Sequence, residues 1–358
     1  MKSNCSMKSK YGLFVAMLLS VLINSLSIAK GQTVDELNTR TKQLEAEIRD
    51  LKAKLQKCQR DRRTADEAEK SIRILQKEND SLKDEIESIR TIEEARSKAE
   101  ANAKLVKIDS DIKDPVFLEY LLKYCDMDND GVLTQWDANH TYVIDIGKDK
   151  SLLNFIGTSN QITSIEGIEH FVNLKRLVCS GNSIPQMNLS KNTLIETFVA
   201  NGCELKILDV SKNDRLTHLE CSNNLLNTID LKNHPNLQIL DVSNNKMAAI
   251  NISGCYELKT FNCSGNELTS LDVSKNVALQ TLDCSNNKIN KLSFTSNIML
   301  DNINCSKNKL TDVDVRNGIL EMKFFDCSKN KDLEFVYFSK GCRIPPENDK
   351  RDVRTYYK

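Results

Sequence analysis

The chain has 358 residues and balances 50 Lys and Arg side chains against 50 Asp and Glu, so its formal net charge is zero. A balanced chain has no overall field to draw it onto nucleic acid or an anionic membrane, which excludes nucleic-acid partners recognised by bulk charge. Twelve cysteines are present, which in an exported chain ordinarily indicates a disulfide framework. Their spacing, described below, indicates a different role.

Residues 1–31 have the order of a secretory signal peptide. Lys8 and Lys10 precede an apolar run from Leu13 to Ile28, and small residues follow it. The run is about sixteen residues, shorter than the roughly 18 to 20 that cross a bilayer comfortably. We therefore expect export and favour cleavage of the segment over its retention as an anchor. The expected destination is the cell surface or the medium, with the periplasm as the alternative.

Residues 32–105 predict an α-helical coiled-coil stalk. Apolar residues alternate by three and four from Val34 to Cys58, and the pattern resumes in a shifted phase from Ile72 to Ile89. A seam repeated every 3.5 residues needs a partner helix. We expect self-association into a homo-oligomer, with Asn79 as a polar core residue that sets the register. The pattern leaves open a dimer, a trimer and a hairpin folded back within one chain.

Residues 112–141 predict a short helix-loop-helix whose loop binds calcium. The oxygen ligands would come from Asp126, Asp128, Asp130, the carbonyl group of Val132, Thr134 and Asp137. Oxygen ligands at alternating positions around a turn-forming glycine, here Gly131, are what this hard cation requires. Two features weaken the match, because the last ligand is Asp where Glu is usual and no second loop is visible to pair with the first. The alternative is a metal-free cap.

Residues 142–342 repeat one pattern at intervals of 21 or 22 residues. The coils begin at Leu152, Leu174, Ile195, Leu216, Leu237, Leu258, Leu279, Leu300 and Met322. The pattern is L-x-x-L-x-C-S-x-N-x-L-x-x-L-D-V-S-K-N, and it is clearest from Leu258 to Asn276, where Phe261 takes the second Leu position. Short alternating segments predict parallel strands, and stacked coils share a core that one coil cannot bury alone. We expect a repeat solenoid, followed by a polar tail at 343–358.

Two columns within the repeat predict structural roles. The asparagines Asn182, Asn224, Asn245, Asn266, Asn287, Asn308 and Asn330 should hydrogen-bond backbone groups at the turns. The cysteines Cys179, Cys221, Cys263, Cys284, Cys305 and Cys327 share one inward position with Ala200 and Val242. A position that accepts Ala, Val and Cys is a small apolar slot. Coils stack at roughly 4.8 Å, wider than the Cβ spacing of a disulfide, so we expect free buried thiols.

The sequence resembles the leucine-rich-repeat proteins exported by Bacteroides-like bacteria, in which an EF-hand-like segment precedes coils of this kind. Asn266 to Asn276 carries the resemblance almost letter for letter, and the likeness extends from Asp114 to about Phe338 without covering the stalk. It implies a surface or secreted interaction protein with a parallel, strand-lined solenoid. Ligands differ among members of that family, and it has no shared catalytic residues, so the resemblance supplies neither.

Outward columns are the candidate ligand faces. Glu220, Asp241 and Asp283 belong to one face, and Asp209, Asp230 and Asp272 belong to the other. In both columns acidic residues largely alternate with Asn or Ser, which limits repulsion between stacked side chains. The simpler interpretation is a solvated ladder that keeps the sheet soluble. The alternative is a polar face for a basic, glycan or cation-bridged ligand.

No catalytic motif is found in the sequence. The four histidines have no metal-ligand spacing, and there is no glycine-rich phosphate loop or nucleophile elbow. We therefore expect a binding or adhesion protein without enzymatic activity, whose partner is an unidentified protein or glycan. The alternative function is a structural spacer or envelope scaffold with no specific ligand.

Overall fold

A computed structural model describes residues 34–57, 62–147, 161–346, 349–350 and 355–357. The chain divides into two units, one ending at Ala101 and the other beginning at Asn102, and each is described by itself. The expected signal peptide lies outside the described residues. Among the residues that are described, no helix combines the length and the apolar character needed to cross a membrane.

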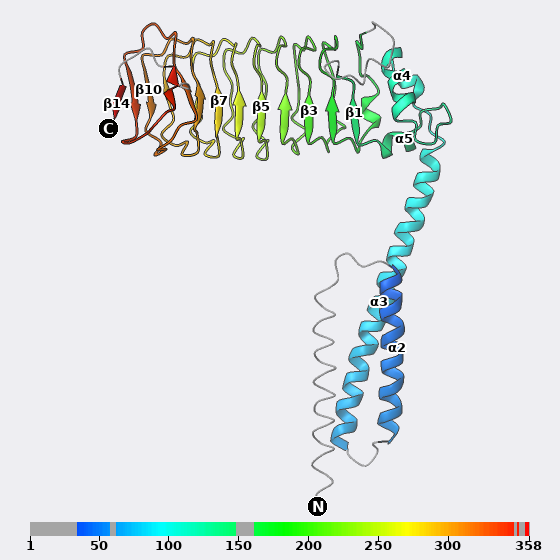
Figure 1. Cartoon of the computed structure of the whole chain (residues 1–358). Helices are drawn as coiled ribbons and strands as arrows, with labels where there is room; N and C mark the ends of the chain where they lie inside the picture. Colours follow the sequence, from blue (N-terminus) through cyan, green and yellow to red (C-terminus); the bar gives the residue numbers. More distant parts are fainter. Residues whose placement is uncertain (1–33, 58–61, 148–160, 347–348, 351–354, 358) are drawn as a thin grey trace, which may run out of the picture. The chain divides into compact units, whose positions relative to one another are not determined.

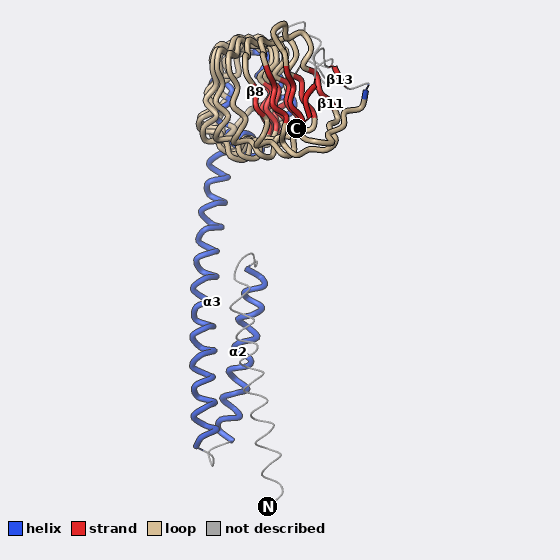
Figure 2. The backbone as a smooth tube through the Cα atoms, turned by 90° about the vertical axis from the view of Figure 1, so that its left-hand side faces the viewer, coloured by secondary structure: helices blue, strands red, loops and turns tan. Residues whose placement is uncertain are grey.

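The first unit contains two long helices, α2 (Val34–Lys57) and α3 (Arg62–Ala103), which run side by side in opposite directions (Figures 1 and 2). Their shared core consists of Leu44, Ile48 and Leu51 on α2 and Ile72 and Leu75 on α3, with Leu82 packed against it. An ion pair of 2.9 Å joins Lys83 on α3 to Glu45 on α2. The heptad seam is therefore satisfied by a hairpin within one chain, and the predicted shift of phase falls where α2 ends and α3 begins.

Asn79 is buried in this hairpin and hydrogen-bonds across it. Hydrogen bonds from Lys83 and Asn79 to the carboxyl group of Glu45 lower the pKa of that group. Asn79 is thus a polar residue in the core of the hairpin, and its expected role in setting the register of an oligomer stays a prediction. A second chain is not needed to bury the seam between Leu37 and Ile86, so self-association of the stalk stays a prediction.

The second unit begins with a helical cap made of η1 (Asp109–Asp111), α4 (Pro115–Tyr124) and α5 (Gln135–His140). Asp114 starts α4, because its Oδ1 accepts the backbone N–H groups of Val116 and Phe117 at 2.9 and 3.0 Å. Its Oδ2 accepts the backbone N–H group of Thr163 at 2.7 Å, which ties the helix to the first coil. Burial alone would raise the pKa of Asp114, but these hydrogen bonds outweigh it and lower the pKa.

The solenoid carries two parallel sheets. The ten-stranded sheet has the order β1 (Val143–Asp145), β2 (Arg176–Val178), β3 (Thr197–Val199), β4 (His218–Glu220), β5 (Ile239–Asp241), β6 (Thr260–Asn262), β7 (Thr281–Asp283), β9 (Asn302–Asn304), β11 (Phe324–Asp326), β13 (Asp349–Lys350). The four-stranded sheet has the order β14 (Thr355–Tyr357), β12 (Phe335–Phe338), β10 (Asp312–Val315), β8 (Leu292–Ser293). A short helix, η3 (Ile168–His170), precedes β2.

Successive coils stack in register, one behind another in Figure 2. The middle residue of each strand from β2 to β7 is buried and its two neighbours are half-buried, as Leu219, Leu240 and Phe261 illustrate in three adjacent strands. The buried side chains of the coils and of the helical cap belong to one continuous core. The predicted fold, a leucine-rich-repeat solenoid of parallel strands, is confirmed.

The end of the chain extends the solenoid past its expected boundary at residue 342. Within the stretch expected to be a polar tail, β13 pairs with β11 and β14 pairs with β12, so each sheet gains one more strand. Thr355, Tyr356 and Tyr357 are strand-forming residues, but β14 depends on pairing with the exposed edge of β12.

The asparagine column makes the backbone hydrogen bonds that the sequence predicts. Asn266 lies between coils, where its amide group donates to the carbonyl groups of Val242 at 2.9 Å and Cys263 at 3.1 Å. Its side-chain oxygen accepts the N–H group of Met247 at 3.0 Å. One buried amide therefore satisfies three backbone groups that would otherwise be left without partners.

The thiol column is also as expected. All six cysteines of the column are free and buried. Burial raises the pKa of Cys221 and Cys284 because a buried thiolate loses its hydration. These thiols therefore act as small core side chains.

We expect Asn266→Leu to lower the free energy of unfolding of the solenoid by about 3 to 5 kcal/mol, because it leaves three buried backbone groups unpaired. Urea denaturation of the full chain measures the change. The control is Asn251→Ala, an exposed residue that accepts only the N–H group of Ser253 and should cost less than about 1 kcal/mol. Equal losses for the two variants would contradict the structural role of the column.

Candidate functional site

The acidic loop between α4 and α5 brings three expected calcium ligands together. One carboxylate oxygen from each of Asp126, Asp128 and Asp130 lies within 4.8 Å of the others. Gly131, at φ +80°, makes the turn and donates its N–H group to Asp126 Oδ2 at 2.9 Å. Asp126 is only 8% exposed, and its Oδ1 is buried without a hydrogen-bond partner. A buried carboxylate oxygen left open beside two more carboxylates suits a cation.

Asp137 does not join this group. Its Oδ1 accepts the N–H group of Met127 at 3.0 Å, and its Oδ2 accepts the N–H and hydroxyl groups of Thr134 at 2.9 and 2.6 Å. The two residues form a capping box that starts α5. In this structure both side chains are engaged at the helix terminus, and the calcium-ligand role expected for Asp137 and Thr134 stays a prediction. The Val132 residue follows the triad, and its N–H group donates to Asp130 at 2.8 Å.

The loop has a pairing segment that the sequence did not reveal. An antiparallel bridge joins Lys107 to Thr134. Around it, Ile108 N–H donates to Leu133 O at 2.9 Å, Gln135 N–H donates to Val106 O at 2.8 Å, and Leu133 N–H donates to Asp109 Oδ1 at 2.7 Å. Residues 106–109 thus pair with the loop edge at which a second calcium loop would be expected to pair. Residues 106–109 carry no calcium-loop motif, so nothing in the sequence indicated that they pair with the acidic loop.

A lysine already lies at the acidic triad. The ammonium group of Lys104 is 3.3 Å from Asp128 Oδ2 and 4.2 Å from the ring centroid of Trp136. Both Lys104 and Asp128 are partly exposed. The ammonium group therefore serves as a partial counter-ion for the triad, held by one ion pair and one cation–π contact.

Two acidic residues expected as ligand contacts on the ten-stranded sheet, Asp241 and Asp283, already form hydrogen bonds within their turn and to the next coil. Asp241 Oδ1 accepts the N–H group of Ser243 at 2.8 Å, and its Oδ2 accepts the side-chain amide of Asn262 at 3.2 Å. Asp283 repeats the arrangement, with Ser285 N–H at 2.9 Å and the Asn304 amide at 3.0 Å. The alternation of Asp with Asn thus forms a hydrogen-bonded ladder along this face.

The second expected face uses the same local turn. The Oδ1 atoms of Asp209, Asp230 and Asp272 each accept the backbone N–H group two residues onward, at 2.9, 3.1 and 2.9 Å. The backbone hydrogen bonds lower the pKa of Asp209 and Asp272. These carboxylates are exposed, but a local turn already explains their presence.

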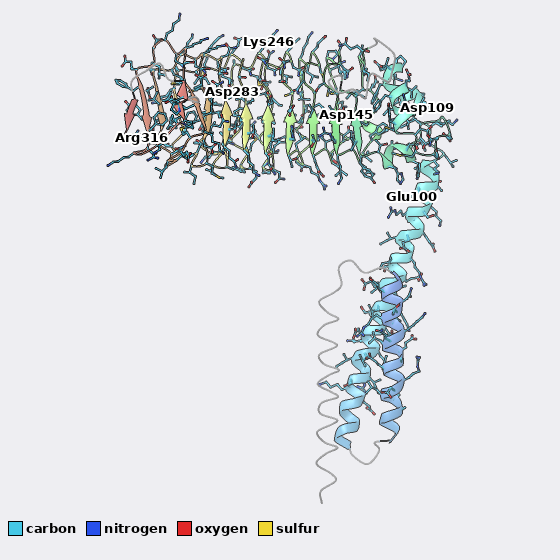
Figure 3. The ribbon with its side chains drawn as sticks, in the orientation of Figure 1. Glu100, Asp109, Asp145, Lys246, Asp283 and Arg316 are labelled. Carbon is cyan, nitrogen blue, oxygen red and sulfur yellow. The ribbon has the colours of Figure 1, made fainter. Side chains whose placement is uncertain are left out.

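The row of hydrogen-bonded Asp and Asn side chains does not extend to the first coils of the ten-stranded sheet, where the surface has a hollow instead. The outward position that holds Glu220 and Asp241 in later coils holds Val178 and Val199 here. The larger side chains of Asp145, Arg176, His218 and Glu220 surround these valines, together with Gly147, Ser180 and Asn201. The result is a hollow of about 240 Å³. Asp145 and Asp283, labelled in Figure 3, mark the hollow and the ladder on the same sheet.

Of the charged side chains around the hollow, Glu220 has hydrogen-bond partners in the described part of the chain and Arg176 does not. Glu220 Oε1 lies 2.6 Å from His218 Nε2, and Glu220 Oε2 accepts the side-chain amide of Asn201 at 2.9 Å. Burial alone would raise the pKa of Glu220, but these hydrogen bonds outweigh it and lower the pKa. Within the described residues, the guanidinium group of Arg176 makes no hydrogen bond or ion pair, although its charge contributes to lowering the pKa of Glu220. Arg176 and the valine floor are therefore the features open to a ligand, and only Glu220 of the expected residues borders them.

The histidines show no catalytic arrangement in the described part of the chain. His140 contacts the carbonyl group of Trp136, and His234 contacts that of Val210. His170 lies between Gln135 and Asp111, and His218 bonds Glu220. None of the four contacts a hydroxyl or thiol group there, so the described residues place no such nucleophile beside a histidine base.

Comparison with known proteins finds similarity to solved structures only. No protein-family model matches the sequence, and no curated protein matches it. The functional domain of InlJ from Listeria monocytogenes, which includes a cysteine ladder, is 25% identical over 66% of this chain, with a TM-score of 0.48. An internalin, InlF, from the same organism is 16% identical over 70% of this chain and 93% of its own, with a TM-score of 0.39. The match spans 57% of the length of the InlJ structure.

We expect Asp137→Ala to lower the free energy of unfolding by about 2 to 4 kcal/mol, because three donors lose a buried acceptor. Asp130→Ala removes an exposed carboxylate from the same loop and should cost less than about 1 kcal/mol. Chemical denaturation with a chelator present compares the two without any contribution from metal. If both variants unfold at the same denaturant concentration, the capping role assigned to Asp137 is wrong.

Proposed function

We propose that this chain is an exported, surface or secreted interaction module, which binds a protein or glycan partner at the hollow over Val178 and Val199. The observation that carries the proposal is the interruption of the hydrogen-bonded ladder at this point of the sheet. Elsewhere on that sheet, Asn262 donates to Asp241 and Asn304 donates to Asp283, so these polar side chains are already hydrogen-bonded. At the hollow, small apolar side chains form a floor beside an unpaired guanidinium group.

This chemistry fits a partner group with an apolar body and an anionic or hydrogen-bond-accepting end. The apolar body would cover the valines, and the acceptor would meet the fork of N–H donors on Arg176. Glu220 already forms hydrogen bonds with His218 at 2.6 Å and with the Asn201 amide at 2.9 Å, so it repels an incoming anion less than a free carboxylate would. The alternative, a structural spacer, would make no use of the hollow.

The test uses the full chain as bait on bacterial and host surface fractions. We expect saturable binding that Val199→Asp and Arg176→Ala reduce by about ten-fold or more, as loss of a central contact does. Val199→Asp extends the acidic ladder into the hollow with a residue that the same outward position accepts in a later coil. The matched control is Thr281→Val, an outward residue on β7 beyond the hollow, which should leave binding unchanged.

Two outcomes would contradict the proposal. Binding that survives both hollow variants would move the binding site elsewhere on the chain. The absence of any saturable binding would favour the spacer. Treating the captured material with protease or with glycosidase decides between a protein and a glycan partner.

We further propose that the acidic loop binds one calcium ion through Asp126, Asp128 and Asp130. The proposal is supported by the buried Asp126 oxygen that lacks a hydrogen-bond partner and by the Gly131 turn. When bound, calcium would supply the charge that balances three neighbouring carboxylates. With Asp137 committed to α5, we expect a dissociation constant of about 10⁻⁴ to 10⁻³ M, as in extracellular modules.

Calcium titration tests this site, with Trp136 as an internal reporter because it is the only tryptophan in the chain. Millimolar calcium should raise the melting temperature and change Trp136 emission, because the cation competes with the ammonium group of Lys104. Lys104→Met should increase calcium affinity by up to about five-fold, the value of an exposed ion pair. Asp126→Asn should abolish both responses, and the control Asp145→Asn should keep them. If neither signal changes in the unaltered chain, the loop is a metal-free cap.

A further inference from the structure

One coil breaks the asparagine column. Cys203 stands at the position that Asn182 holds in the coil before it and Asn224 in the coil after it. In later coils the asparagine amide donates to the carbonyl group 24 residues earlier, as Asn224 does to Ala200 at 2.7 Å. The Cys203 thiol donates to the carbonyl group of Cys179, also 24 residues earlier, at 3.2 Å. The thiol therefore takes the place of the amide in the inter-coil contact.

This replacement brings two thiols together. Cys179 belongs to the thiol column, the Cys203 thiol contacts its carbonyl group at 3.2 Å, and the two thiols are close enough to shift each other's pKa. Adjacent members of the thiol column, such as Cys263 and Cys284, show no thiol hydrogen bond although they stack in neighbouring coils. A second column of buried asparagines, which includes Asn213, Asn276 and Asn297, bonds carbonyl groups 24 residues earlier. Cys255 interrupts that column in a similar way, but its thiol contacts the carbonyl group of Leu231 at 3.7 Å. Cys179 and Cys203 are thus a pair by position as well as by contact.

The two members of the pair differ in reactivity. The interaction with the Cys179 thiol lowers the pKa of Cys203, with help from the backbone N–H groups of Asn182 and Gly181. The same interaction, together with complete burial, raises the pKa of Cys179. Because the thiolate is the attacking species in disulfide exchange, Cys203 is the first nucleophile of the pair.

We propose that Cys179 and Cys203 form a disulfide when the chain meets a low-molecular-weight disulfide, such as oxidised glutathione. The Cys203 thiolate attacks one sulfur of that disulfide and releases one small thiol. Cys179 then gives up its proton and attacks the Cys203 sulfur of the mixed disulfide, which releases the second small thiol. In total, two protein thiols are oxidised and one small disulfide is reduced to two thiols that carry the two protons. Both cysteines are buried, so exchange proceeds through local opening of these coils.

The disulfide would staple two neighbouring coils at one end of the solenoid. Cys179 directly follows Val178, and Val199 lies four residues before Cys203, so the staple lies directly behind the floor of the hollow. The proposal does not depend on ligand binding at the hollow, because it rests on the contact between the two thiols. Its effect is to hold the first coils against the opening to which the end of a repeat array is prone.

The test incubates the full chain with oxidised glutathione and maps disulfides by mass spectrometry of non-reduced digests. We expect one cross-linked peptide that joins Cys179 to Cys203, with the loss of two hydrogen atoms, and full alkylation of Cys263 and Cys284 after denaturation. The melting temperature should rise by about 5 to 10 °C and return on reduction, as closure of a loop of this length predicts.

Two variants keep the test interpretable. Cys203→Asn restores the amide of the column, so it should fold, form no cross-link and melt at the same temperature with and without oxidant. Cys179→Ala places in the thiol column the residue that Ala200 supplies one coil later, and it should behave in the same way. The proposal is overturned if Cys179 and Cys203 in the unaltered chain are alkylated as fully as Cys263 after oxidation. A cross-link between Cys263 and Cys284 in place of the expected one would overturn it equally.

Discussion

Buried side-chain amides that bond backbone groups of adjacent coils are the interaction on which the rest of this structure depends. A strand of three residues satisfies few of its own coil's backbone groups, and the turns that follow it are buried against the next coil. Asn266 and its equivalents resolve this problem by serving two coils at once. Because every coil meets the same demand, the period stays near 21 residues, and outward side chains fall into straight rows. The ladder, the thiol column and the hollow are all consequences of that alignment.

The proposed binding surface is then defined by departure from the repeat. Where Asp and Asn alternate along the ten-stranded sheet, the side chains satisfy one another and leave little for a partner to bind. Where Val178 and Val199 replace them, the surface becomes hollow and Arg176 stays unpaired. The same logic identifies Cys203, which is a departure within the asparagine column. Sites in a repetitive protein are therefore found most readily by asking which residue fails to match its neighbours one coil away.

The repeat, its strands and both columns could be predicted from sequence because each depends on spacing alone. The pairing of the stalk helices could not, since a heptad seam such as Leu44, Ile48 and Leu51 states that a partner exists without giving its chain or direction. The capping contacts of Asp137 could not be predicted either, because a carboxylate at that position suits a ligand and a helix cap equally, and only the positions of Met127 and Thr134 reveal the cap. Two further features could not be predicted because their partners are distant in the chain. One is the pairing of residues 106–109 with the acidic loop, and the other is the addition of β13 and β14 to the sheets.

The register of the coils has a consequence for how such a protein changes length. Between β5 and β7 each coil contributes one strand, one column amide and one residue at the inward position of the thiol column. Removing or duplicating a whole coil there would join equivalent edges, so the rows on either side would still meet. The hollow lies at the capped end, apart from this stretch, and the two C-terminal strands close the other end. The middle of the molecule is thus free to lengthen or shorten over generations while its two specialised ends remain intact.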